Sequence, residues 1–326
     1  MQSIFQKKWL LAKIILAASI LSSQAFAKDK IFVARKGNKN FKVVLDELQK
    51  ELTDYDFIDY VLGNDESYTK FEKKVRGSDA KLMVLMDNAS VTLGKQFFIN
   101  NKKSSVKAGV ALMALNLPAA IDGNEHLAGI AFESPAYTMV TSFKQVTTKP
   151  VKNVLVLYRK SVFENLIQES KEQLALEKIK LHAVDVEAGG IEETLKKYLF
   201  EEINKGSYDV VWVLLDSALL KAEYFKGIWI KASTKTKIPF ISGTELFAMP
   251  KLDFCTFVIT PELKDMAGQA AQIIDSILRD GLKPSDIGNK GIEKVESVTK
   301  ILNKNKAKSI GLAIDESALT TVRILK

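Results

Sequence analysis

The stretch Val154–Val186, with the sequence VLVLYRKSVFENLIQESKEQLALEKIKLHAVDV, decides the fold class. Its first five residues form an uninterrupted apolar run, which predicts a strand covered on both faces. Residues 161–176 then follow with helical spacing of apolar side chains, and residues 180–186 predict a second strand. Strand, helix and strand in this order form the βαβ unit of a parallel sheet. The stretch therefore predicts an α/β protein.

The same alternation extends to both sides of this stretch. Further strands are predicted over residues 31–34, 57–61, 82–86, 109–114, 210–215, 239–242 and 254–259. Further helices are predicted after a cap at Asn40 and over residues 67–75, 191–204, 222–232 and 261–279. The pattern restarts after Lys149-Pro150, and a chain of this length exceeds what one hydrophobic core organises. Two similar, doubly wound (Rossmann-like) lobes are expected, and the short C-terminal segments must complete their sheets.

The N-terminus has the features of a secretory signal peptide. Three lysines precede or flank an apolar run over residues 10–21, and Ala25 and Ala27 provide the small residues before a cut after Ala27. A membrane anchor is the alternative, but the run is shorter than the roughly 20 residues that span a bilayer. No Cys lies near the cut, which excludes lipid attachment there. We expect export to the periplasm and removal of residues 1–27.

Charge and cysteine content narrow the function classes. The net charge is +8, and the expected cut removes three Lys and no acid, which leaves +5. The basic residues are interspersed with acids and form no basic stripe, so a nucleic-acid partner is not expected. The single cysteine, Cys255, cannot form an intramolecular disulfide, and its apolar surroundings predict a small buried side chain in a strand.

The reactive groups that an enzyme of this class needs are not apparent. Of the two histidines, His182 lies in an alternating strand pattern and His126 in a predicted loop, without a second His or Cys at metal-ligand spacing. No nucleophile elbow, phosphate loop or dinucleotide motif follows a predicted strand. We therefore expect no cofactor, no metal and no catalysis. An α/β enzyme stays as an alternative. Turnover that is lost when Asp87 or Asp216 is mutated would support it.

Polar residues follow many of the predicted strands. In parallel sheets, ligands bind beyond the carboxyl ends of the strands, and helix N-termini there suit a carboxylate or another anion. Plain helix capping is the alternative, because Ser, Asp and Asn are the preferred cap residues. The sets are residues 87–90, 133–134, 159–161, 216–217 and 242–245.

Four segments resemble one family of proteins. Residues 150–158, 208–217, 237–242 and 266–287 are similar to the ABC-transporter substrate-binding proteins that include tryptophan- and tyrosine-binding members. The resemblance implies a periplasmic binding protein-like I fold, in which three chain segments form the hinge between the lobes. It implies a lobe I of residues 28–132 plus 251–283 and a lobe II of residues 133–250 plus 284–326.

The resemblance also implies a function and a set of ligand-binding residues. The protein would be a monomeric receptor that captures a small molecule between its lobes and delivers it to an inner-membrane ABC permease. The alternative is a ligand-binding module of the same fold that serves a sensor or envelope partner. Amino-acid-like solutes are candidates, but family motifs with Thr-Pro and Asp-Pro are replaced here, which argues against assigning an aromatic amino acid. The implied ligand-binding residues are Asp87, Asn88, Ser90, Asn116, Glu133, Ser134, Tyr158, Asp216, Gly243, Thr244 and Glu245.

Overall fold

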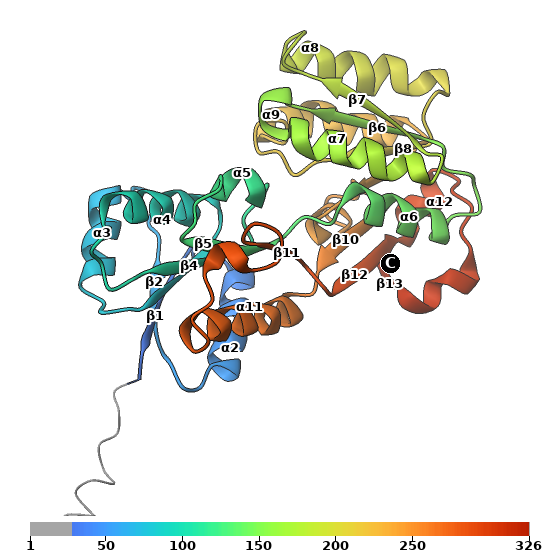
Figure 1. The fold of residues 1–326 in the computed structure, drawn as a ribbon. Helices are drawn as coiled ribbons and strands as arrows, with labels where there is room; N and C mark the ends of the chain where they lie inside the picture. Colours follow the sequence, from blue (N-terminus) through green and yellow to red (C-terminus); the bar gives the residue numbers. More distant parts are fainter. Residues whose placement is uncertain (1–27, 326) are drawn as a thin grey trace, which may run out of the picture.

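The computed structural model describes residues 28–325, which form two α/β lobes (Figure 1). Each lobe is built on one sheet with helices on both faces, as predicted. The expected signal peptide, residues 1–27, lies outside the described residues. Within residues 28–325, no helix combines the length and apolar character that crossing a membrane requires.

Lobe I contains a six-stranded parallel sheet in the order β11-β5-β4-β3-β1-β2. The central strand β3 is wholly buried because helices cover both faces of the sheet. Helices α2 and α11 pack on one face, and α3, α4 and α5 pack on the other. The elements are β1 (Lys30–Arg35), α2 (Lys39–Glu51), β2 (Asp56–Val61), α3 (Tyr68–Arg76), β3 (Leu82–Met86), α4 (Asn88–Asn100), β4 (Ala108–Leu112), α5 (Leu117–Ile121), β5 (Leu127–Ala131), α11 (Leu263–Leu278) and β11 (Ile292–Lys294).

Lobe II contains a seven-stranded sheet in the order β13-β12-β10-β9-β8-β6-β7. Strand β12 runs antiparallel to β10, and the other pairs are parallel. Its two apolar cores lie on opposite faces of the sheet. The elements are α6 (Ala136–Val146), β6 (Asn153–Tyr158), α7 (Lys160–Leu176), β7 (Lys180–Asp185), α8 (Ile191–Lys196), β8 (Val210–Val213), α9 (Ala222–Tyr224), α10 (Ile230–Lys235), β9 (Phe240–Ser242), β10 (Phe257–Pro261), β12 (Val298–Asn303), α12 (Lys304–Ser309) and β13 (Arg323–Leu325).

The chain passes between the lobes three times. The second and third passages lie at other residues than predicted. The first lies before α6, near residues 132–135. Lobe I was expected to resume at residue 251, but β10 pairs with β9 and β12 in lobe II, so the second passage lies at Glu262. Lobe II was expected to resume at residue 284, but β11 pairs with β5 in lobe I, so the third lies at residues 295–297. Local sequence does not encode these long-range pairings.

Some local predictions also need correction. Helix α2 is capped by Asn38, whose side chain accepts from the Asn40 backbone, and not by Asn40. The helix predicted over residues 191–204 continues from α8 as a π-helical turn and then a 3-10 turn. Cys255 is buried as expected but precedes strand β10.

Candidate functional site

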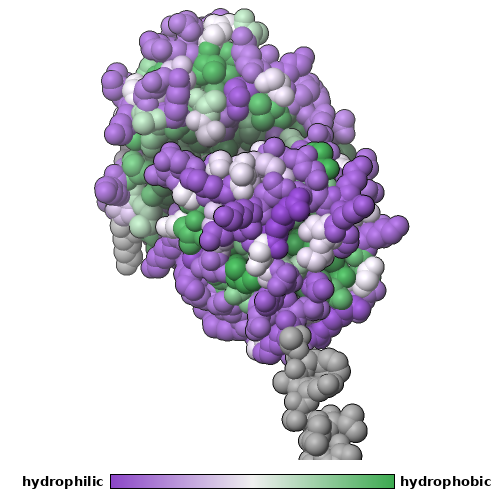
Figure 2. All heavy atoms as spheres, turned by 90° about the vertical axis from the view of Figure 1, so that its left-hand side faces the viewer, coloured by the Kyte–Doolittle hydropathy of each residue, from purple (hydrophilic) through white to green (hydrophobic). Residues whose placement is uncertain are grey.

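The two lobes approach each other at the carboxyl ends of their strands. The Asn116 Nδ2, at the start of α5 in lobe I, donates to the Val162 carbonyl in α7 of lobe II at 2.9 Å. Figure 2 shows a hollow between the lobes, with hydrophobic atoms inside it and hydrophilic residues on its rims. We call the strand ends that hydrogen bonds link to this contact the cleft edge: 87–90, 115–116 and 133–134 in lobe I, and 159–162, 185–187 and 216–218 in lobe II.

Asp87 follows β3 at the cleft edge and has a strained backbone conformation. Its φ of 107° is rare for a residue with a side chain. The Oδ1 accepts from the Ser90 backbone N–H at 2.8 Å and so caps α4. The Oδ2 is buried and has no hydrogen-bond partner. Asp87 is therefore a helix cap with one carboxylate oxygen left unsatisfied.

The loops after β3, β4 and β5 are joined by side-chain hydrogen bonds. Asn88 exchanges two bonds with the Leu115 backbone, at 2.7 and 2.8 Å. The Asn116 backbone N–H donates to both carboxylate oxygens of Glu133, at 2.7 and 3.0 Å. Asn116 has a left-handed backbone, which directs its side chain to lobe II. Hydrogen bonds thus link the strand ends that carry Asp87, Asn88, Asn116 and Glu133, and ligand binding by these residues stays a prediction.

Glu133 lies in the first passage between the lobes, and its environment disfavours the ionised form. Burial raises the pKa of its carboxyl to about 7, although the hydrogen bond from Asn116 opposes this shift. The neighbouring Ser134 hydroxyl is also buried and has no hydrogen-bond partner. A carboxyl with a raised pKa and a hydroxyl without a hydrogen-bond partner therefore lie side by side in the hinge.

Replacing Glu133 with glutamine should make stability less dependent on pH. Because the folded-state pKa is above the unfolded value, the protonated carboxyl favours folding, and this contribution is lost as pH rises from about 4.5 to about 7. Glu133→Gln stays neutral and can still accept from Asn116. We expect it to exceed the original protein at pH 8 by about 2 to 3 kcal/mol in unfolding free energy, with little difference at pH 4.

Urea denaturation across this pH range measures the effect. Glu125→Gln, at an exposed side chain on the opposite edge of lobe I, is the matched control and should leave the pH profile unchanged. A parallel pH profile for Glu133→Gln and the original protein would contradict the assignment of Glu133 as the titrating group.

In lobe II the carboxyl ends of β6 and β8 are joined by an ion pair. The Arg159 Nε and Nη2 donate to the two carboxylate oxygens of Asp216, at 2.8 and 2.9 Å. The Asp216 side chain is 1 % exposed and that of Arg159 is 25 % exposed. The hydrogen bond to Asp216 raises the pKa of Arg159. Arg159 thus presents one side of its guanidinium at the cleft edge, while Asp216 is buried beneath it.

The N-terminus of α7 already holds carboxylates from the protein itself. The Glu187 Oε2 accepts from the Ser161 backbone N–H at 2.8 Å and its Oε1 from the Ser161 hydroxyl at 2.6 Å. These bonds lower the pKa of Glu187. The Asp185 Oδ1 accepts from the Lys160 backbone N–H at 3.3 Å. The capping alternative therefore describes this helix start better than a vacant anion site.

Several implied ligand residues are engaged elsewhere. The Tyr158 ring packs in the lobe II core and its hydroxyl donates to Glu164 at 3.0 Å, and burial with this bond raises the pKa of Tyr158 to about 12. Ser90 is fully buried and its hydroxyl donates to the Asp87 carbonyl. Glu245 pairs with Arg323 at 2.5 Å, Gly243 is buried beside Leu215, and Thr244 precedes a 3-10 turn. As ligand contacts these residues stay predictions.

Sequence reasoning missed the partners of the predicted residues. Arg159 and Ser161 were noted at a strand end, but the contacts to Asp216 and Glu187 connect residues 57 and 26 positions apart. One signal was present for Arg159, because a buried aspartate such as Asp216 almost always has a partner. The Val162 carbonyl carried no signal, since backbone acceptors are common to all residues.

The groups most often used for catalysis lie away from the cleft edge. His182 contacts Asn153, and His126 contacts the Lys107 carbonyl, both near the amino ends of strands. Cys255 is fully buried, which raises its pKa well above the usual value. Within residues 28–325, no cluster of three His, Cys, Asp or Glu side chains could hold a metal ion.

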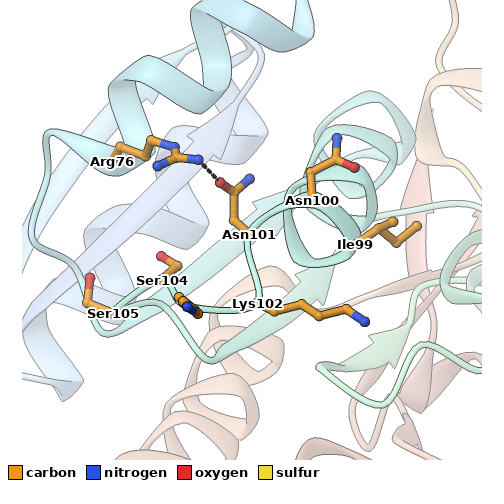
Figure 3. Close-up of a pocket in the computed structure, with 8 residues that line it drawn as sticks. Arg76, Ile99, Asn100, Asn101, Lys102, Ser104 and Ser105 are labelled. Carbon is orange, nitrogen blue, oxygen red and sulfur yellow. Dashed lines mark hydrogen bonds between the residues drawn. The ribbon is translucent and has the colours of Figure 1, made fainter.

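Other hollows also lie away from the cleft edge. The pocket in Figure 3, of about 550 Å³, lies where α3 and α4 end, with Arg76 directed at Asn101. A second lies between α2 and α11, and a third at the amino ends of β6, β8 and β9. These pockets are not part of the candidate site.

Comparisons with known proteins identify the fold. No protein-family model and no curated protein matches the chain. A substrate-binding protein with adhesive properties from Clostridium difficile, in its ligand-free, open structure, is similar with a TM-score of 0.68 and 14 % identity, covering 91 % of this chain and 99 % of that one. A conserved domain protein from Vibrio cholerae gives 0.61 and 16 %, covering 92 % and 100 %.

A third similar structure is an ABC domain in complex with L-Trp from Streptococcus pneumonia. Its TM-score is 0.59 at 15 % identity, covering 91 % of this chain and 100 % of that one. These likenesses and the strand orders confirm the periplasmic binding protein-like I fold that the family resemblance implied.

Proposed function

We propose that the protein is an exported receptor that captures a small solute between its two lobes. The observation that carries the proposal is the contact of Asn116 with Val162, because it joins the polar strand ends of both lobes. Ligands of parallel α/β sheets bind at such ends. The solved structures of this fold support it, since one is a substrate-binding protein and another holds L-Trp.

Export, delivery and the absence of catalysis are finer parts of the proposal. Cleavage after Ala27 would release the chain into the periplasm, and the solute would pass to an inner-membrane ABC importer. Binding without turnover is supported by the positions of both histidines and of Cys255 away from the cleft edge. Adjacent permease and ATPase genes would favour transport over a sensor module.

A thermal-shift screen tests solute capture. Amino acids, amines, nucleosides, sugars and hydrophobic small molecules should include one that raises the melting temperature by about 5 °C at a hundredfold excess over its Kd, because binding only the folded state stabilises it by about 2.7 kcal/mol. Small-angle scattering with that compound should show a smaller radius of gyration, because the lobes close on it. A folded sample that responds to no compound in the screen would refute solute capture.

A further inference from the structure

The charge of the cleft edge is opposite to that of the whole chain. The chain carries 47 Lys and Arg against 39 Asp and Glu, for a net charge of +8. The cleft edge contains five carboxylates and only two basic side chains. These are Asp87, Glu133, Asp185, Glu187 and Asp216, with Arg159 and Lys160. A cleft lined by one sign of charge attracts a ligand of the other sign.

Three positions that could bind a ligand carboxylate at the cleft edge are already filled. The Asp216 carboxylate accepts two hydrogen bonds from the Arg159 guanidinium. Glu187 occupies the first turn of α7. The Oδ1 of Asp87 occupies the first turn of α4. In each case an internal carboxylate sits where an anionic group of a solute would otherwise bind.

On the lobe I side, by contrast, neither Asp87 nor Glu133 forms a hydrogen bond with a basic side chain. The Oδ2 of Asp87 is buried without a donor, although a carboxylate oxygen out of contact with water is costly. Glu133 accepts from the Asn116 backbone, but no basic side chain bonds to it. At the end of the neighbouring strand β1, Arg35 is held by Asp59 at 2.8 and 2.6 Å and so does not serve either acid.

We infer that the lobe I side of the cleft, at Asp87 and Glu133, binds a protonated amine, and that the solute is a cationic amine. This inference rests on the proposed function and names its substrate class. An ammonium group supplies up to three donors and a positive charge, which matches two carboxylates that lack a cation. A solute carboxylate is not required for binding.

The same geometry connects the amine to lobe closure. Glu133 holds the Asn116 backbone, and the Asn116 side chain reaches the Val162 carbonyl of lobe II. An ammonium beside Glu133 keeps its carboxylate ionised as the acceptor for Asn116. Amine binding therefore favours the conformation in which Asn116 bridges the lobes.

Matched probes test the inference on the purified protein by isothermal titration calorimetry at physiological salt. Putrescine, γ-aminobutyrate and succinate share a four-carbon skeleton, and tryptamine, tryptophan and indole-propionate share an aromatic one. In at least one series we expect the pure amine to bind no more weakly than the amino acid, and the pure acid not to bind. Binding of a pure acid without its amine, through the uncapped first turn of α6, would overturn the inference and leave solute capture standing.

Two substitutions locate the amine. Asp87→Asn keeps the oxygen that caps α4 and has the same side-chain shape as the aspartate, but it removes the charge. Glu133→Gln keeps an acceptor for Asn116. Each should weaken binding of the amine by about tenfold or more. Asp315→Asn is the matched control, because Asp315 caps a remote 3-10 helix through Ser317, and it should leave the affinity unchanged.

The outcomes separate the inference from the proposed function. An amine that binds equally well to Asp87→Asn and Glu133→Gln would overturn the assigned site. Failure of both amines to bind would overturn the inference, whereas solute capture falls only if the wider thermal-shift screen also gives no response.

Discussion

Replacing Gly129 with alanine is expected to destabilise lobe I by about 3 kcal/mol or more. Gly129 lies in β5 between β4 and β11, and its N–H donates to the Gly291 carbonyl at 2.8 Å. An added Cβ would lie 2.4 Å from the Ala111 carbonyl oxygen and 3.0 Å from Leu117 Cδ2. Because the nearer atom is backbone, relief requires β4 and β5 to move apart.

Separating these strands would also disturb the candidate site. Strand β5 leads to Glu133, and β4 leads to Asn116, so the hydrogen bonds between these residues depend on the spacing of the strands. We therefore expect any ligand response to fall along with stability. Urea denaturation followed by circular dichroism measures the first effect, and thermal shift with a binding solute measures the second.

Gly268→Ala is the matched control for this substitution. Gly268 lies in α11 of the same lobe, and nothing lies within 4 Å of an added Cβ. The variant should be more stable by about 0.5 to 1 kcal/mol, because alanine loses less conformational freedom than glycine in a helix. Equal stabilities of the two variants would show that the close approach of β4 and β5 is not rigid.

The fold was predictable where local pattern and packing agree. Strand β3 was predicted to the residue, because its five apolar side chains are all buried between two helical layers. Strands β12 and β13 were not predicted, since VTKILN mixes polar and apolar residues without alternation and RIL has only three residues. β12 is a strand because it pairs with the edge of β10, and β13 is a strand because it pairs with β12. Pairing of this kind is also why the second and third passages between the lobes lie at other residues than predicted.

The sequence indicated which strand ends carry polar residues, but not the contacts that these residues make. Polar residues after β3 and β5 indicated that Asp87 and Glu133 lie at a common edge, because parallel strands end there, whereas Asn116 was implied by the family resemblance. Whether each caps a helix or binds a solute depends on individual atoms. Asp87 shows why, since Oδ1 caps α4 while Oδ2 has no partner. No sequence pattern distinguishes these two oxygens.

Replacing Asp216 with alanine should destabilise lobe II by about 2 to 3 kcal/mol. Loss of one partner of a buried ion pair costs about 3 to 5 kcal/mol, and the 25 % exposure of the Arg159 side chain reduces this value because water solvates the freed guanidinium. Asp216→Asn should cost less, because its Oδ1 can still accept from the Ala218 backbone N–H, now at 2.9 Å. Urea denaturation of both variants measures the difference.

A double-mutant cycle isolates the pair itself. Arg159→Ala combined with Asp216→Ala should cost less than the two single changes together, by about 1 to 3 kcal/mol, because neither charge is then left alone. Additive effects would show that Asp216 acts through its backbone contacts and not through Arg159.

The same substitution should change which solutes bind. Once Asp216 is removed, Arg159 offers two free donors at the cleft edge, in the geometry that a carboxylate accepts. We therefore expect Asp216→Ala to gain affinity for γ-aminobutyrate or tryptophan relative to the corresponding amine, while Asp87 and Glu133 still hold the ammonium group. A preference that stays unchanged in calorimetry would mean that Arg159 does not face the solute, and the internal carboxylate would then have only a structural role.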